Sequence, residues 1–96
     1  MISVIFSYTL PIKKSKDEML ELFKHAEPMF RGMNGLQRKT FCYDEASGQG
    51  MSLYQWDSEQ TAAICFAPSF LQKFEDAFGT KPQVSTMPVL FTIDNS

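Results

Sequence analysis

The stretch "GLQRKTFCYDEASGQGMSLYQW", residues 35–56, decides the fold, because two alternating segments surround a polar turn. Residues 36–43 and 51–56 alternate in a way that is typical of β-strands with one buried face. The segment "DEASGQG" between them consists of turn-forming residues, so the two strands are predicted to form a hairpin. Arg38 and Lys39 lie on opposite faces of the first strand. We therefore expect an edge strand protected by charge.

A strand and a helix precede this hairpin. In "ISVIFSYTL", residues 2–10, every even position is apolar, which predicts a half-buried strand that Pro11 ends. Ser15 and Glu18 have the spacing of a capping box and predict the start of a helix. Pro28 disfavours helical geometry at the residue before it, so the helix should kink or stop there. Its buried stripe would consist of Met19, Leu22, Phe23 and Ala26.

A second helical region and a last strand follow the hairpin. Residues 57–79 have helical spacing, and Pro68 is expected to divide them into two pieces. Phenylalanines recur there every four residues, which indicates an aromatic stripe packed against the sheet. Residues 84–93 alternate as a strand, and Pro88 within them indicates an edge strand or a bulge.

The order strand, helix, strand, strand, helix, strand predicts a ferredoxin-like α+β fold. Right-handed crossovers place the first and third strands in the middle of a four-stranded antiparallel sheet, with the helices on one face. The length of 96 residues suits one domain, which would span residues 1–96.

The face of the sheet away from the helices is predicted to be apolar. It would hold Ile5, either Phe41 or Cys42, and part of the row of Met51 and Leu53. Such a face favours a homodimer in which two sheets pack against each other. The alternative is a monomer with a mildly apolar face.

Composition excludes several classes of function. The net charge of −2 argues against nucleic acid as a partner, and no apolar run is long enough for a membrane span. No signal peptide is apparent, which favours a cytoplasmic protein in which Cys42 and Cys65 stay reduced and buried. The sequence has neither a metal-ligand spacing nor a glycine-rich dinucleotide loop. We therefore expect no metal, flavin or haem cofactor.

The hairpin also indicates one wall of a pocket for a hydrophobic small molecule, such as a fatty acid or a polycyclic phenol. Tyr54 and Trp56 share a strand face, and the aromatic helix follows at once. His25 and Tyr54 are the candidate catalytic residues, and Lys13, Lys14 or Lys16 the candidates for holding an acidic head group. The predicted pocket is lined by Phe6, Tyr8, Phe23, Tyr54, Trp56, Phe66, Phe70 and Phe74.

The segments "GLQRK", "EASGQG", "LYQWDSEQTAA" and "DNS" resemble the YdhR-type branch of the dimeric α+β-barrel superfamily, which includes the antibiotic-biosynthesis monooxygenases. The matches lie at Gly35, Leu36 and Lys39, and at the aromatic pair and small residue Tyr54, Trp56 and Ala62. The resemblance implies a dimeric barrel, a pocket between sheet and helices, and monooxygenase activity. The haem-degrading relatives carry an Asn on the first strand and a Trp and a His on the second helical region. This sequence has none of these, so haem degradation is not expected.

Two functional hypotheses stay open at this stage. In the first, the protein is a cofactor-independent monooxygenase, which needs a dry pocket, a base and a donor for the substrate oxyanion. In the second, it is a non-catalytic module that binds an acyl chain or another hydrophobic ligand.

Overall fold

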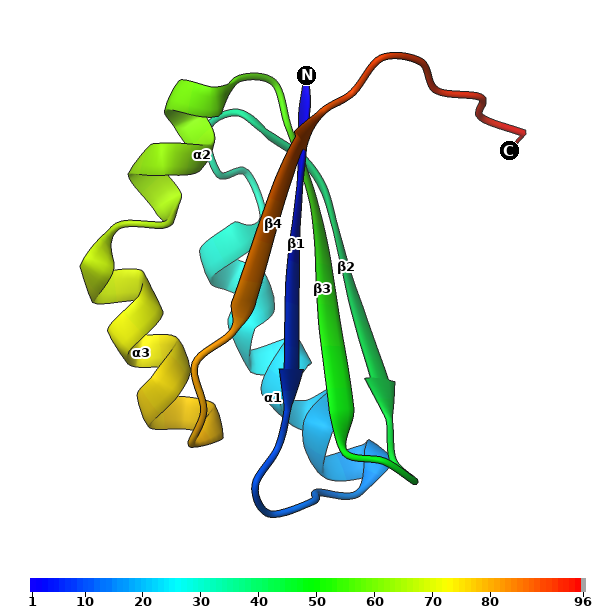
Figure 1. Cartoon of the computed structure of the whole chain (residues 1–96), viewed down its shortest axis with the longest axis vertical. Coiled ribbons are helices and arrows are strands. Elements are labelled where there is room, and N and C mark those ends of the chain that lie inside the picture. Colours follow the sequence, from blue (N-terminus) through cyan, green and yellow to red (C-terminus); the bar gives the residue numbers. More distant parts are fainter. Residues whose placement is uncertain (96) are drawn as a thin grey trace.

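The protein is a four-stranded antiparallel sheet with helices packed on one face, as a computed structural model that describes residues 1–95 shows (Figure 1). The sheet order is β2-β3-β1-β4, so the first and third strands lie in the middle. The predicted ferredoxin-like fold is confirmed. The elements are β1 (Ile2–Thr9), α1 (Lys16–Phe30), β2 (Leu36–Asp44), β3 (Gln49–Trp56), α2 (Glu59–Cys65), α3 (Pro68–Phe78) and β4 (Gln83–Pro88).

The helix ends follow local sequence signals. Ser15 and Glu18 form both hydrogen bonds of the predicted capping box at the start of α1. The helix does not stop before Pro28 but continues through it to Phe30. Pro68 separates α2 from α3 and begins α3 at its first turn, where its missing N–H costs no hydrogen bond.

The core lies between the sheet and the helices. Phe6 and Trp56 are fully buried on the helix-facing side of the two central strands. The predicted aromatic stripe, which begins at the end of α2 and continues through α3, packs against this side. The rings of Phe66, Phe70 and Phe74 all lie within 6.1 Å of the Phe6 ring, centroid to centroid.

Of the two residues that the sequence leaves as alternatives for the open face of the sheet, Cys42 lies there and Phe41 does not. Phe41 faces the helices and stacks on Phe23 of α1 with 4.5 Å between ring centroids. The pairing of β2 with β3 shifts by one residue between Leu36 and Arg38, which breaks the simple alternation at the start of β2. The expectation that both cysteines are buried is also wrong: Cys42 is exposed and Cys65 is half-buried.

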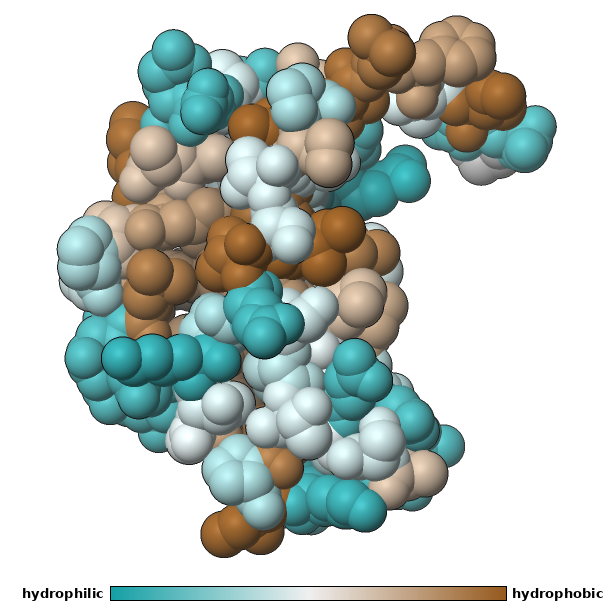
Figure 2. Space-filling view, viewed as in Figure 1, coloured by the Kyte–Doolittle hydropathy of each residue, from teal (hydrophilic) through white to brown (hydrophobic). Residues whose placement is uncertain are grey.

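The last strand is shorter than predicted, because it ends at Pro88 and not at Ile93. Ile2, the first residue of β1, pairs with Pro88, so the residues beyond have no strand beside them. One further hydrogen bond joins Val89 N to Met1 O. The chain then leaves the sheet as an extended tail, which points away from the molecule and carries a row of hydrophobic side chains (Figures 1 and 2).

Candidate functional site

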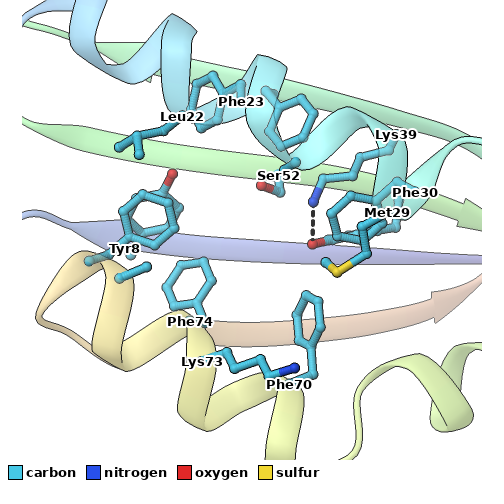
Figure 3. A pocket seen from close by; sticks show the side chains of 15 residues that line it. Tyr8, Leu22, Phe23, Met29, Phe30, Lys39, Ser52, Phe70, Lys73 and Phe74 are labelled. Carbon is cyan, nitrogen blue, oxygen red and sulfur yellow. Dashed lines mark hydrogen bonds between the residues drawn. The ribbon is translucent and has the colours of Figure 1, made fainter.

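A cavity of about 190 Å³ lies between α1, α3 and the helix-facing side of the sheet (Figure 3). A closed apolar cavity of about 150 Å³ is large enough for benzene, so this one suits a single ring with a short substituent. Its apolar walls come from α1, β2 and α3, and five polar side chains also reach it. The apolar residues are Leu22, Phe23, Ala26, Met29, Phe30, Phe41, Phe70, Phe74, Ala77 and Phe78. The polar ones are Tyr8, Lys39, Ser52, Tyr54 and Lys73.

The side chain of Lys39 is the central polar feature of the cavity. It extends from the helix-facing side of β2 and brings Nζ to 3.6 Å from the centre of the Phe30 ring. The same atom lies 4.3 Å from the centres of the Phe41 and Tyr54 rings and donates a hydrogen bond of 2.7 Å to Tyr54 Oη (Figure 3). Within residues 1–95, no acidic side chain forms an ion pair with this amine. The rings and the tyrosine hydroxyl are its immediate surroundings.

Burial makes this amine unusually easy to deprotonate. Desolvation by burial lowers the pKa of Lys39 from its ordinary value of 10.5 to about 7, and the nearby Cys65 thiol opposes that shift in part. The same effect raises the pKa of the Tyr54 hydroxyl far above its ordinary range. Near neutral pH, a substantial fraction of Lys39 is therefore the neutral amine, beside a tyrosine that keeps its proton. This pair can accept one proton and donate another.

A second buried tyrosine faces the same cavity. Burial raises the pKa of Tyr8 to about 12, and the neighbouring Tyr43 adds to that shift. Tyr8 also packs edge-on against Phe74, with 5.0 Å between ring centroids. It therefore stays a neutral hydroxyl at physiological pH and adds a second hydrogen-bonding group to a mostly apolar wall.

The structure brings part of the predicted pocket together. Five of the eight predicted residues line the cavity, and three lie in the core beside it. The three are Phe6, Trp56 and Phe66. Trp56 is separated from the cavity because it stacks on the far side of Tyr54, with 6.3 Å between ring centroids. The five that line the cavity are Tyr8, Phe23, Tyr54, Phe70 and Phe74.

The predicted base and the predicted anion partners lie elsewhere. His25 is exposed on α1 and is not among the residues that line the cavity. Lys13 donates from Nζ to the backbone oxygen of Ala46, which ties the start of α1 to the hairpin. The amine at the cavity wall is instead that of Lys39, whose charge the sequence pattern indicates as protection of an edge strand. The sequence does hold a signal for this position of Lys39, because residues two apart on a strand share a face and Phe41 faces the helices.

Among residues 1–95, no group of three or more His, Cys, Asp or Glu side chains is arranged to hold a metal ion. A search of the same residues also finds no helix both long and apolar enough to cross a membrane.

Comparison with solved structures identifies the fold. A monooxygenase from the gene ActVA-Orf6 of Streptomyces coelicolor, solved with the ligand nanaomycin D, superimposes with a TM-score of 0.72 and 16% identity, covering 99% of this chain and 92% of that one. SnoaB, a cofactor-independent oxygenase from Streptomyces nogalater, superimposes with a TM-score of 0.70 and 13% identity, and the match covers 96% of this chain and 95% of SnoaB. Rv0793 from Mycobacterium tuberculosis superimposes with a TM-score of 0.68 and 10% identity, and the match covers 98% of this chain and 100% of Rv0793.

By sequence alone, no family model and no curated protein matches this chain. The likeness therefore lies in the fold. It confirms, at that level, the resemblance to antibiotic-biosynthesis-monooxygenase-like proteins that the sequence indicated.

Proposed function

We propose that the protein binds an apolar ring compound with an ionisable hydroxyl group in this cavity and oxygenates it with O₂ without a cofactor. One observation carries the proposal. The half-buried Lys39 amine and the Tyr54 hydroxyl, 2.7 Å apart, form a polar pair at the wall of a mostly apolar cavity. Cavities that bind small molecules usually have this composition, with mostly apolar walls and a few placed polar groups.

The chemistry begins with removal of a proton. The neutral Lys39 amine takes the proton of the ligand hydroxyl, and a base whose pKa is close to the working pH suits that task. The Lys39 ammonium and the Tyr54 O–H then stabilise the resulting ring oxyanion in a site with little water. Both groups lie where they could contact one ligand oxygen together.

The remaining steps need no further reagent. The electron-rich ring passes one electron to O₂, and the ring radical and superoxide combine at a ring carbon as a peroxide. After protonation, the peroxide loses water across the C–H and O–O bonds and leaves a carbonyl group. One oxygen atom enters the product and the other leaves as water, so the substrate supplies all the electrons.

The comparisons support the proposal by analogy of fold. SnoaB is described as a cofactor-independent oxygenase, and the Streptomyces coelicolor monooxygenase was solved with nanaomycin D bound. A site with proton-transfer groups and aromatic walls is compatible with that chemistry. The alternative is a binding module without catalysis, and the experiment below separates the two.

The test begins with binding and continues with turnover. Under nitrogen, a panel of one- to three-ring phenols is titrated into the protein by calorimetry, and we expect saturable binding by at least one member. In air, that ligand should then be consumed with equal amounts of O₂ taken up and no metal or flavin added. Binding without O₂ uptake beyond the protein-free rate would leave a binding module and contradict the oxygenase. No binding across the panel would contradict the proposed class of ligand and with it the oxygenase.

We further propose that the working form is a homodimer joined by the open faces of two sheets. Leu53 is central on this face, between Thr40 of β2 and Ile5 of β1, and is 36% exposed. The exposed C-terminal tail adds apolar surface that one chain leaves uncovered, with the side chains of Leu90, Phe91 and Ile93. Association of two copies would remove both surfaces from water. Each Å² of apolar area buried in this way would stabilise the dimer by roughly 25 cal/mol.

A further inference from the structure

The Lys39 amine has a second chemical capacity that proton transfer does not use. A primary amine that is neutral near physiological pH is a nucleophile toward carbonyl carbon, and proteins prepare such lysines by desolvating them. Lys39 is surrounded by the rings of Phe30, Phe41 and Tyr54, with Nζ within 4.3 Å of each ring centre. Its side chain ends at the cavity wall, beside the Tyr54 hydroxyl (Figure 3).

We propose that Lys39 Nζ forms an imine with aldehydes and ketones of apolar single-ring compounds that enter the cavity. The proposal rests on the same ligand cavity as the proposed function but on none of its oxygen chemistry. The pocket volume of about 190 Å³ has room for a carbonyl compound with one ring and a short substituent.

The groups around Nζ can complete the reaction without another reagent. The nitrogen lone pair adds to the carbonyl carbon, and one of the two nitrogen protons passes to the carbonyl oxygen to give a carbinolamine. The Tyr54 hydroxyl, 2.7 Å from Nζ, can then donate a hydrogen bond to the departing oxygen. That oxygen takes the second nitrogen proton and leaves as water, and a carbon–nitrogen double bond remains.

Two features around Nζ favour formation of the imine. Most of the cavity wall is apolar, so water competes poorly for the imine carbon. No acidic side chain within residues 1–95 pairs with the amine to hold it as an ammonium ion. Lys73, the other lysine at the cavity, is exposed on α3 and lacks such an aromatic enclosure.

The test traps the imine with benzaldehyde as the probe. The whole chain is incubated at pH 7 with benzaldehyde and sodium cyanoborohydride, which reduces an imine to a stable benzylamine. Intact mass follows the number of benzyl groups, and peptide mapping identifies the modified lysine. A lysine with its pKa near 7 is about half neutral at that pH, against less than one part in a thousand for an ordinary lysine. We therefore expect Lys39 to be labelled on the order of a hundredfold faster than any other lysine.

Matched variants and a competitor complete the design. Lys39→Arg keeps the cation but cannot form the imine and should lose the fast label. Lys24→Arg changes an exposed lysine of α1 and should leave it unchanged. Ethylbenzene, which fills an apolar cavity without a carbonyl group, should slow the labelling. Because mapping of the unmodified protein identifies the site by itself, the result does not depend on the folding of either variant.

Three results would overturn the proposal, and the third differs from the others in what it says of the proposed function. Labels spread over the exposed lysines at similar rates would contradict the imine alone. Benzaldehyde that binds by calorimetry but gives no adduct at Lys39 would do the same and would leave the ligand cavity intact. If neither benzaldehyde nor any phenol binds, the imine and the proposed function fail together.

Discussion

Lys39→Met is expected to slow oxygenation by about 10²- to 10⁴-fold, the usual contribution of a general base, while leaving the protein folded. Methionine has nearly the length of lysine and no charge, so it keeps the packing against Phe30 and Phe41 but cannot accept the ligand proton. The ratio kcat/KM for the phenol that turns over is the quantity to compare. An unchanged ratio would remove Lys39 from the mechanism.

The same substitution should change how stability depends on pH. Between pH 7 and the ordinary lysine value of 10.5, the unfolded chain holds a proton that the folded Lys39 has released. The free energy of unfolding of the unmodified protein therefore rises with pH in this range, by up to about 1.4 kcal/mol for each pH unit. Lys39→Met lacks this rise. Its stability relative to the unmodified protein should fall by roughly 2 kcal/mol between pH 7 and 9.

Urea denaturation at several pH values and one protein concentration measures this difference. Lys24→Met is the matched control, because Lys24 is exposed on α1 and its substitution should leave the pH profile parallel to that of the unmodified protein. Parallel profiles for Lys39→Met as well would mean that the Lys39 amine is charged in the folded protein at pH 7 to 9.

Leu53→Asp is expected to weaken the proposed homodimer by at least about a hundredfold in dissociation constant. An unpaired carboxylate buried in an interface costs about 3–5 kcal/mol, and the two-fold symmetry of the dimer introduces it twice. Leu53 lies at the middle of the open face, so its side chain would be among the most completely covered. Sedimentation velocity over a range of protein concentrations measures the change.

Ile64→Asp provides the matched control for that change. Ile64 is 77% exposed on α2, which lies on the helix side of the sheet, so the same kind of substitution there should leave the dimer intact. A monomer for the unmodified protein at micromolar concentration would contradict the dimer. Equal dissociation constants for the Leu53→Asp and Ile64→Asp dimers would also contradict a dimer joined by the open faces of the sheets.

Local patterns in the sequence were enough to predict most of the fold. The capping box at Ser15, the break at Pro68 and the alternation in residues 2–10 each depend on neighbours within a few positions. The end of the last strand could not be predicted in this way. It depends on where β1 begins, because a strand needs a partner beside it, and Pro88 is the last residue opposite β1.

The candidate site was predicted less completely, for a related reason. Aromatic residues such as Phe23 and Phe74 were placed at the cavity because their spacing shows which face of a helix they share. The irregular pairing near Arg38 obscures in the sequence which face of β2 is buried, so the pattern leaves Phe41 and Cys42 as alternatives for the open face and indicates a surface charge for Lys39. Only the three-dimensional arrangement reveals that three rings from separate parts of the chain surround the Lys39 amine.

The protonation state of Lys39 is tested most directly by an NMR titration of the lysine side chains, labelled with ¹³C at Cε, from pH 5 to 11. We expect one resonance with a midpoint near 7, which is missing from the spectrum of Lys39→Met. Such a result would establish the neutral amine on which the proton transfer and the imine both depend. A Lys39 resonance that titrates only above about pH 9.5, close to the range of ordinary lysines, would contradict the proposed roles of Lys39.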